Sequence, residues 1–281
     1  MHGSPWTFSP HPVAWVVVVA LAVAYGLAVR RPEWRATRRQ VVMFASGLLL
    51  LLVCCSWPLA DLAAHWSLSA LVVQRLVLTL AVPPLLILGT PQPIVVALTR
   101  PAPVDAIVRR CTRPAVAVVV VTVVAVGTLT VAAVQWQSSS TIGRGLLDLV
   151  LLLAGIVLWT PVLHHLPGLS RPSALGRAGY LIIQSIVPSF LAVVWIFARH
   201  PLYPAYAHAR LFGMAPLTDQ QLAGFVAKLG TIAALWTVAF VVLSRAQRAS
   251  ERGEDGETLT WADVERQLLR LDRYQRRDKI E

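Results

Sequence analysis

Long apolar runs separated by short polar segments dominate the sequence. Each of seven runs is close to the roughly 20 apolar residues that a helix needs to cross a bilayer. We expect helices over residues 12–29, 40–58, 68–88, 115–135, 144–163, 178–198 and 219–243. The first run is preceded by ten residues without Lys or Arg, which favours a retained helix over a cleaved signal peptide. The pattern predicts an all-α, polytopic membrane protein with a bundle of seven transmembrane helices.

The basic residues between these runs predict the orientation. Alternate segments, together with the C-terminal tail, hold 20 of the 25 Lys and Arg residues. The other segments hold only Arg144, Arg199 and Arg210, and Arg144 falls at the start of a predicted helix. Because loops rich in Lys and Arg stay in the cytoplasm, we expect the N-terminus outside and the C-terminus in the cytoplasm.

Composition narrows the class of protein. Of 281 residues, 56% are hydrophobic and 14% are charged, whereas a soluble domain is usually about one quarter charged. The three Cys residues, two of them adjacent, exclude a disulfide-stapled secreted protein. A net charge of +11 would suggest nucleic acid in a soluble protein. Here topology accounts for the charge, so we expect lipid and no nucleic acid as a partner.

The sequence divides into two parts. We expect a seven-span membrane domain over residues 1–244 and a polar cytoplasmic tail over 245–281. In the tail, Thr260 and Asp263 resemble a helix start. Apolar residues at helical spacing then predict a short amphipathic helix: Trp261, Val264, Leu268 and Leu271. This helix either binds a membrane surface or a partner, or is a solvated end of the chain.

Three ionisable residues lie inside predicted spans: Arg75, Asp148 and Lys228. Each costs roughly 2.5–3.5 kcal/mol on insertion scales and so needs a reason. Arg75 and Asp148 fall at the same depth, about 7–10 Å below the outer boundary at 1.5 Å of rise per residue. They either pair inside the bundle or extend separately to the interface. Together with Lys228 and Gln74 they form a predicted intramembrane polar centre, functional or structural.

Side chains that suit copper or zinc gather on the predicted outer side. The leading candidates are His65, His200, His208 and Met214, followed by His2, His11, Cys54 and Cys55. Their spacing is not a metal signature, since His200 and His208 are eight residues apart in a Pro-rich loop. Two interpretations stay open: a copper site, or interfacial His residues with buried thiols.

Four segments resemble a known family. The third span has Gln74 followed by Ala81-Val82-Pro83-Pro84-Leu85-Leu86-Ile87-Leu88-Gly89, and the fifth has Ala154-Gly155 followed by Trp159 and Pro161. The outer loop has Leu202-Tyr203-Pro204 with Tyr206, and the seventh span opens with Asp219-Gln220-Gln221-Leu222-Ala223-Gly224. From about Trp6 to about Ser244 the order and spacing are similar to the CtaG-like assembly factors of bacterial caa-type cytochrome c oxidases.

The resemblance implies a seven-span factor that matures haem–copper cytochrome c oxidase in the bacterial plasma membrane. Copper delivery and a scaffold role are both compatible with it. Its partners would be oxidase subunits or copper chaperones. No nucleophile with a base, phosphate loop or zinc motif is present in the sequence, so we expect no enzymatic activity.

The sequence also departs from this family. A His pair usual around the Gln of the third span corresponds to Leu71 and Arg75. A His-rich stretch usual in the fifth span corresponds to 144–149, where Asp148 is the acid, and a usual Trp corresponds to Lys228. These departures favour a divergent member that acts as a scaffold or on another ligand.

Two other function classes compete with the resemblance. A small-solute or ion transporter would use Arg75, Asp148 and Lys228 as a polar pathway. A retinal protein would use Lys228 as its Schiff base, but the predicted third span offers no acid as counter-ion.

Overall fold

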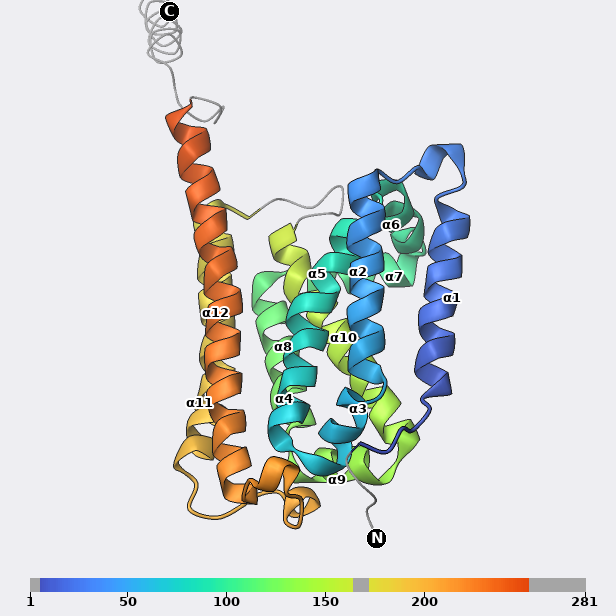
Figure 1. The fold of residues 1–281 in the computed structure, drawn as a ribbon. Coiled ribbons are helices and arrows are strands. Elements are labelled where there is room, and N and C mark those ends of the chain that lie inside the picture. The colour runs from blue at the N-terminus through green and yellow to red at the C-terminus, as the bar shows by residue number, and fades with distance from the viewer. Residues whose placement is uncertain (1–5, 164–171, 253–281) are drawn as a thin grey trace, which may run out of the picture. The chain divides into compact units, whose positions relative to one another are not determined.

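The computed structural model describes residues 6–163 and 172–252, and every regular element in those ranges is helical. Figure 1 shows their arrangement. The helices are α1 (Pro12–Ala28), α2 (Arg38–Cys55), α3 (Leu59–Asp61), α4 (Leu68–Leu76), α5 (Val82–Gly89), α6 (Gln92–Thr99), α7 (Ala102–Cys111), α8 (Pro114–Thr128), α9 (Val131–Ser139), α10 (Thr141–Leu163), α11 (Ala174–Phe197) and α12 (Pro216–Glu251). Two π-helical segments, η2 (Leu62–Trp66) and η3 (Val77–Ala81), flank α4. Short 3₁₀ turns are η1 (Pro32–Trp34), η4 (Pro204–Tyr206) and η5 (Leu211–Gly213).

The expectation of an all-helical membrane protein is confirmed. Within the described residues, five helical stretches are long and apolar enough to cross a bilayer: α2, α4–η3–α5, α10, α11 and α12. A sixth arises if α7 and α8, bent by 89° at their junction, form one span. At 17 residues, α1 is apolar but shorter than those five. Seven spans and the outside N-terminus stay predictions.

The prediction of one continuous helix over 115–135 is wrong, because the helix breaks after Thr128. α8 ends at Thr128, and α9 begins three residues later at Val131. The side chain of Thr130 accepts a hydrogen bond from the backbone N–H of Ala133 and so caps the new helix. A capping Thr inside an apolar run is easily missed when only hydrophobicity is followed.

The prolines of the third span explain the π-helical segment in its middle. Pro83 has no N–H, so the carbonyl of Thr79 loses its intrahelical partner. The indole N–H of Trp159 on α10 donates to that carbonyl at 3.1 Å. Gly155 makes the approach possible, because a Cβ there would lie 2.5 Å from Cγ of Pro83. Residues from two spans therefore compensate for one break.

The helices around this break form the centre of the bundle. α5 packs against both α2 and α10, while α10 and α11 both contact α8 (Figure 1). Residues 1–239 form one compact unit and residues 240–281 a second. The site described below lies wholly in the first unit. The predicted amphipathic tail helix lies outside the described residues.

Candidate functional site

The carboxylate of Asp219, in the first turn of α12, lies on the N-terminus of α4. It accepts hydrogen bonds from Ser67 Oγ at 2.8 Å, Leu68 N at 2.6 Å and Ser69 Oγ at 2.6 Å. Ser67 is itself the N-cap of α4. The first N–H groups of a helix lack intrahelical partners and form its positive end, so a carboxylate is well placed there. Asp219 therefore joins two helices that are about 150 residues apart in sequence.

Two tyrosines fix the loop that precedes α12. The Tyr203 hydroxyl donates to the carbonyl of Leu129 at 2.6 Å, and the Tyr206 hydroxyl donates to the carbonyl of Ala63. Pro204 opens the 3₁₀ turn between them. Burial raises the pKa of both phenols, so they stay protonated and act as donors at neutral pH.

The two glutamines that follow Asp219 complete the attachment. Gln220 is buried, and its Oε1 accepts from the backbone N–H of Leu202 at 2.7 Å. The amide of Gln221 donates to the carbonyl of Ala198 at 3.4 Å. We refer to residues 198–219 as the cap. The predicted motif residues thus serve to hold the cap in one conformation.

Phe212 is an exposed and strained residue on the cap. Its backbone is left-handed, with φ of 53°, and its side chain is 76% exposed. The left-handed region costs a bulky side chain of order 1–3 kcal/mol. The ring of Trp6 lies 6.0 Å from the ring of Phe212. The cap therefore presents an aromatic group at an energetic cost.

A polar cluster beside the cap is centred on Asp61. Its carboxylate accepts from Ser9, lies 3.1 Å from His11 Nε2 and 3.4 Å from Arg144 Nη1. Burial would raise the pKa of Asp61, but the bonds from Ser9 and His11 and the charges of His11 and Arg144 outweigh it and lower that pKa. Arg144 also places Nη2 3.2 Å from His65 Nε2. The N-terminal segment is thereby tied to the bundle.

Arg75 is buried, as predicted, but its partners are neutral. Nη1 donates to the carbonyl of Thr128 at 2.5 Å, and Nη2 donates to Gln137 Oε1 at 2.7 Å. The ion pairs found within residues 6–163 and 172–252 do not include Arg75 with Asp148, so the two side chains are not in direct contact, although each lies within electrostatic range of the other. The reason is local: α8 ends at Thr128, and its terminal carbonyl needs a donor.

The other members of the predicted polar centre form no direct ion pair with Arg75 within the described residues, although Asp148 lies within electrostatic range of it. Asp148 is half-buried, and its carboxyl lies within hydrogen-bonding range of the Cys55 thiol. Its Oδ1 has no hydrogen-bond partner in the described part of the chain. Lys228 is half-buried on α12. Gln74 is buried and donates to the carbonyl of Cys54 at 2.8 Å. A polar pathway through these residues stays a prediction.

The predicted metal ligands are not brought together. His200 and His208 are exposed on the cap, and Met214 is half-buried at its end. No group of three His, Cys, Asp or Glu side chains able to hold a metal occurs among the residues that the structure describes. His65 Nε2 lies 3.2 Å from Nη2 of Arg144, so that nitrogen is engaged by a cation. The copper site stays a prediction. His2 lies outside the described ranges.

The sequence prediction missed several residues of the site. Asp61, Ser67 and Ser69 were not singled out, although an acid and two hydroxyl residues beside a span start are typical caps. Gln137, the acceptor for Arg75, carried no signal because it lies in a segment expected to be a loop. Long-range partners of this kind depend on how the helices pack.

Comparisons with known proteins support one family. The sequence model described as cytochrome c oxidase caa3 assembly factor (Caa3_CtaG) matches residues 23–249. No curated protein and no solved structure matches the chain.

Proposed function

The chain belongs to the cytochrome c oxidase caa3 assembly factor family, and from this premise we propose that it is a non-catalytic scaffold that presents its cap to an oxidase subunit in the bacterial plasma membrane. The partner would dock while the haem–copper centres of the oxidase are completed. Delivery of copper by this chain is the less favoured role.

The observation that carries the proposal is Phe212. Interface hot spots are enriched in aromatic side chains that fill pockets on the partner. Phe212 is 76% exposed although its backbone is left-handed. The tyrosines and Asp219 hold the cap that carries it, so little conformational entropy is lost on docking. Preorganisation of this kind suits a binding surface.

The coordination chemistry favours a scaffold over a copper donor. Copper transfer needs ligands with available lone pairs, such as thiolates, imidazoles and thioethers. His65 Nε2 is engaged by Arg144, a fixed cation that also repels a metal ion. His200 and His208 are exposed on the cap and suit contacts with a partner as well as with a metal.

The test is complementation of a deletion strain in the native host. Strains would carry the wild type, Phe212→Ala, or Phe225→Ala, whose phenylalanine is 50% exposed on α12 outside the cap. Oxidase activity and reduced-minus-oxidised haem spectra would be recorded at equal protein level, with and without added copper. We expect Phe212→Ala to resemble the deletion and Phe225→Ala to resemble the wild type.

Copper separates the two roles. A scaffold defect persists when copper is added, whereas a supply defect is restored. Full rescue of the deletion by copper would overturn the proposal. If the two Phe variants had equal activity, the cap would not be the docking surface.

A further inference from the structure

The short elements α6, α7 and η1 lie at the end of the bundle opposite the cap (Figure 1). The third span begins beside Asp219 at Leu68 and ends at Gly89. The carbonyl of Gly89 accepts from the Tyr25 hydroxyl at 2.9 Å, near the end of α1. α6 follows directly and contacts both η1 and α7. These three elements therefore form one surface, at the other end of the spans from the cap.

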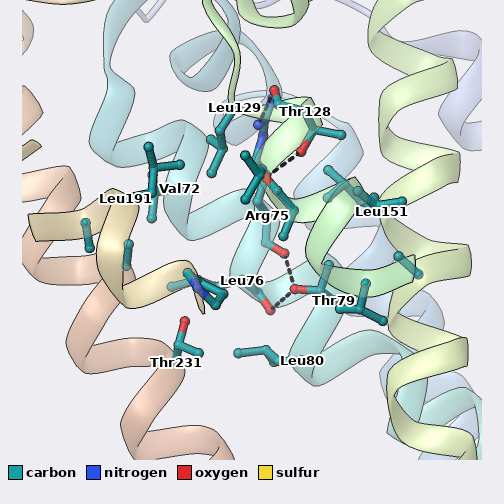
Figure 2. A pocket seen from close by; sticks show the side chains of 18 of the residues that line it. Val72, Arg75, Leu76, Thr79, Leu80, Thr128, Leu129, Leu151, Leu191 and Thr231 are labelled. Carbon is teal, nitrogen blue, oxygen red and sulfur yellow. Dashed lines mark hydrogen bonds between the residues drawn. The ribbon is translucent and has the colours of Figure 1, made fainter. Parts of the chain in front are cut away.

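The bend between α7 and α8 turns α7 across the direction of the spans. α8 contacts α10 and α11, and the carbonyl of its last residue, Thr128, accepts from Arg75 Nη1 at 2.5 Å. Figure 2 shows Thr128 and Leu129 beside Arg75, at a small aliphatic cavity that α8 helps to line. The axis of α8 is thereby fixed among the spans. Since α7 meets α8 at 89°, α7 runs along the end of the bundle and not through it.

Two faces of α7 carry opposite kinds of side chain. Val104, Ile107 and Val108 recur at helical spacing on one face, and Ile107 is 63% exposed. Arg109 and Arg110 lie on the other face and are exposed. Charged side chains are costly among acyl chains, whereas an apolar side chain such as Ile107 is unfavourable in water. An amphipathic helix that lies across the spans therefore suits the interface between headgroups and acyl chains.

The surface around α7 is strongly cationic. Residues 30–39 carry five arginines and residues 100–113 carry four, and all of them are exposed. The same two stretches hold two acids, Glu33 and Asp105. Among the ion pairs found in the described part of the chain, one includes these arginines, and in it Arg109 Nε donates to Asp105 at 2.7 Å. Most of the positive charge on this surface is therefore not neutralised by the described residues.

The bend, the apolar face and the charge together specify an anionic membrane surface. We propose that α7 binds the leaflet at this end of the bundle, with Ile107 among the acyl chains and the surrounding arginines on anionic phosphate headgroups. A planar guanidinium matches phosphate oxygens in a bidentate geometry. Basic residues that only set the orientation of the spans would need neither the bend nor the apolar face of α7.

Arginines at the two ends of the bundle provide matched variants. Arg109→Gln combined with Arg110→Gln removes two exposed charges from α7 and leaves its apolar face intact. Arg199→Gln combined with Arg210→Gln removes two exposed charges from the cap. Both double variants lose the same charge, so a difference between them reports the position of the arginines rather than the net charge of the protein.

The experiment uses the full-length protein in a non-ionic detergent, and native mass spectrometry measures the binding of single lipid molecules. Phosphatidylglycerol is compared with phosphatidylcholine of the same acyl chains. An arginine near an anionic membrane surface strengthens binding about fivefold. We therefore expect the wild type to bind phosphatidylglycerol at least about 25-fold more tightly than phosphatidylcholine, through two or more arginines. The α7 double variant should bind phosphatidylglycerol about 25-fold more weakly than the wild type, and the cap double variant should bind it as the wild type does.

Hydrogen exchange in nanodiscs locates the contact. Backbone amides of α7 should exchange at least about fivefold more slowly in phosphatidylglycerol than in phosphatidylcholine, the factor expected from one engaged arginine. Amides of η4, on the cap, should exchange at the same rate in both lipids.

Equal affinity of the wild type for the two lipids would overturn the proposal, as would an equal loss of affinity in the two double variants. Exchange of the α7 amides that is the same in both lipids would also overturn it. The comparison of the two lipids uses the wild type, so it decides even if a variant does not fold. Oxidase activity is not measured in these assays, so their outcome is independent of the scaffold role.

Discussion

Replacing Asp219 by Asn should weaken the junction between α12 and α4 more than an ordinary surface change would. One carboxylate oxygen accepts from Leu68 N at 2.6 Å, and the other accepts from Ser69 Oγ at 2.6 Å. In Asn one of these oxygens becomes a donor, so the two positions cannot both be satisfied as before. The hydrogen bonds that remain no longer have a charged acceptor, so their strength falls roughly by half.

The magnitude follows from these contacts. A buried donor that loses its acceptor, either Leu68 N–H or the Ser67 and Ser69 hydroxyls, costs about 1–3 kcal/mol, and loss of a negative charge at a helix N-terminus costs about 0.3–1 kcal/mol. We therefore expect Asp219→Asn to lower the free energy of unfolding by about 2–4 kcal/mol. Asp105→Asn is the matched control, because Asp105 forms an exposed pair with Arg109 on α7. Its expected cost is below about 1 kcal/mol.

The assay is equilibrium unfolding in mixed micelles of non-ionic detergent and SDS, followed by circular dichroism. A double-mutant cycle with Ser69→Ala should give a coupling energy of about 0.5–3 kcal/mol, because the two side chains are in direct contact. If Asp219→Asn costs no more than Asp105→Asn, the carboxylate does not hold the cap, and the explanation of the motif is wrong.

Three further predictions follow from the same contacts. Trp159→Phe leaves the carbonyl of Thr79 without its donor and should cost about 1–3 kcal/mol in the same unfolding assay. The pKa of Asp61 is lowered, so its ionised form favours docking of the N-terminal segment. Docking should persist at neutral pH and be lost only as the pH falls below about 4. Hydrogen exchange of the His11 backbone amide measures this loss, and Asp61→Asn should abolish the pH dependence. Phe212→Asn relieves the left-handed strain because Asn tolerates that region, so the cap should be at least as stable while oxidase assembly falls; a matching loss of stability would mean that Phe212 acts only through the fold.

The sequence predicted most of the helices because apolar runs of span length have few other solutions in a bilayer. The expected helix over 144–163 corresponds to α10 at Thr141–Leu163, and that over 178–198 corresponds to α11 at Ala174–Phe197. The prediction of depth placed Arg75 inside the bundle, where it is buried. Depth does not determine direction, however, since each residue turns the helix by about 100°. Arg75 therefore contacts the end of α8 rather than Asp148.

Residues on which the family resemblance rests form two local clusters, and both clusters stabilise the fold. Pro83, Gly155 and Trp159 create and compensate for a break in the third span. Tyr203 and Asp219 fix the cap. Each cluster needs partners from distant parts of the chain, which explains why the sequence identified its residues without indicating what they do.

Two of the residues that the resemblance leads us to expect as departures from the family are cations placed among oxygen and nitrogen acceptors. Arg75 takes the carbonyl of Thr128, and Arg144 takes a carboxylate oxygen of Asp61 and faces His65 Nε2. A guanidinium directs five N–H donors and a permanent charge at its neighbours, so it occupies lone pairs that a metal ion would need and cannot be released as a metal can. For this reason we propose the cap, rather than a metal centre, as the part of the chain that acts on the oxidase.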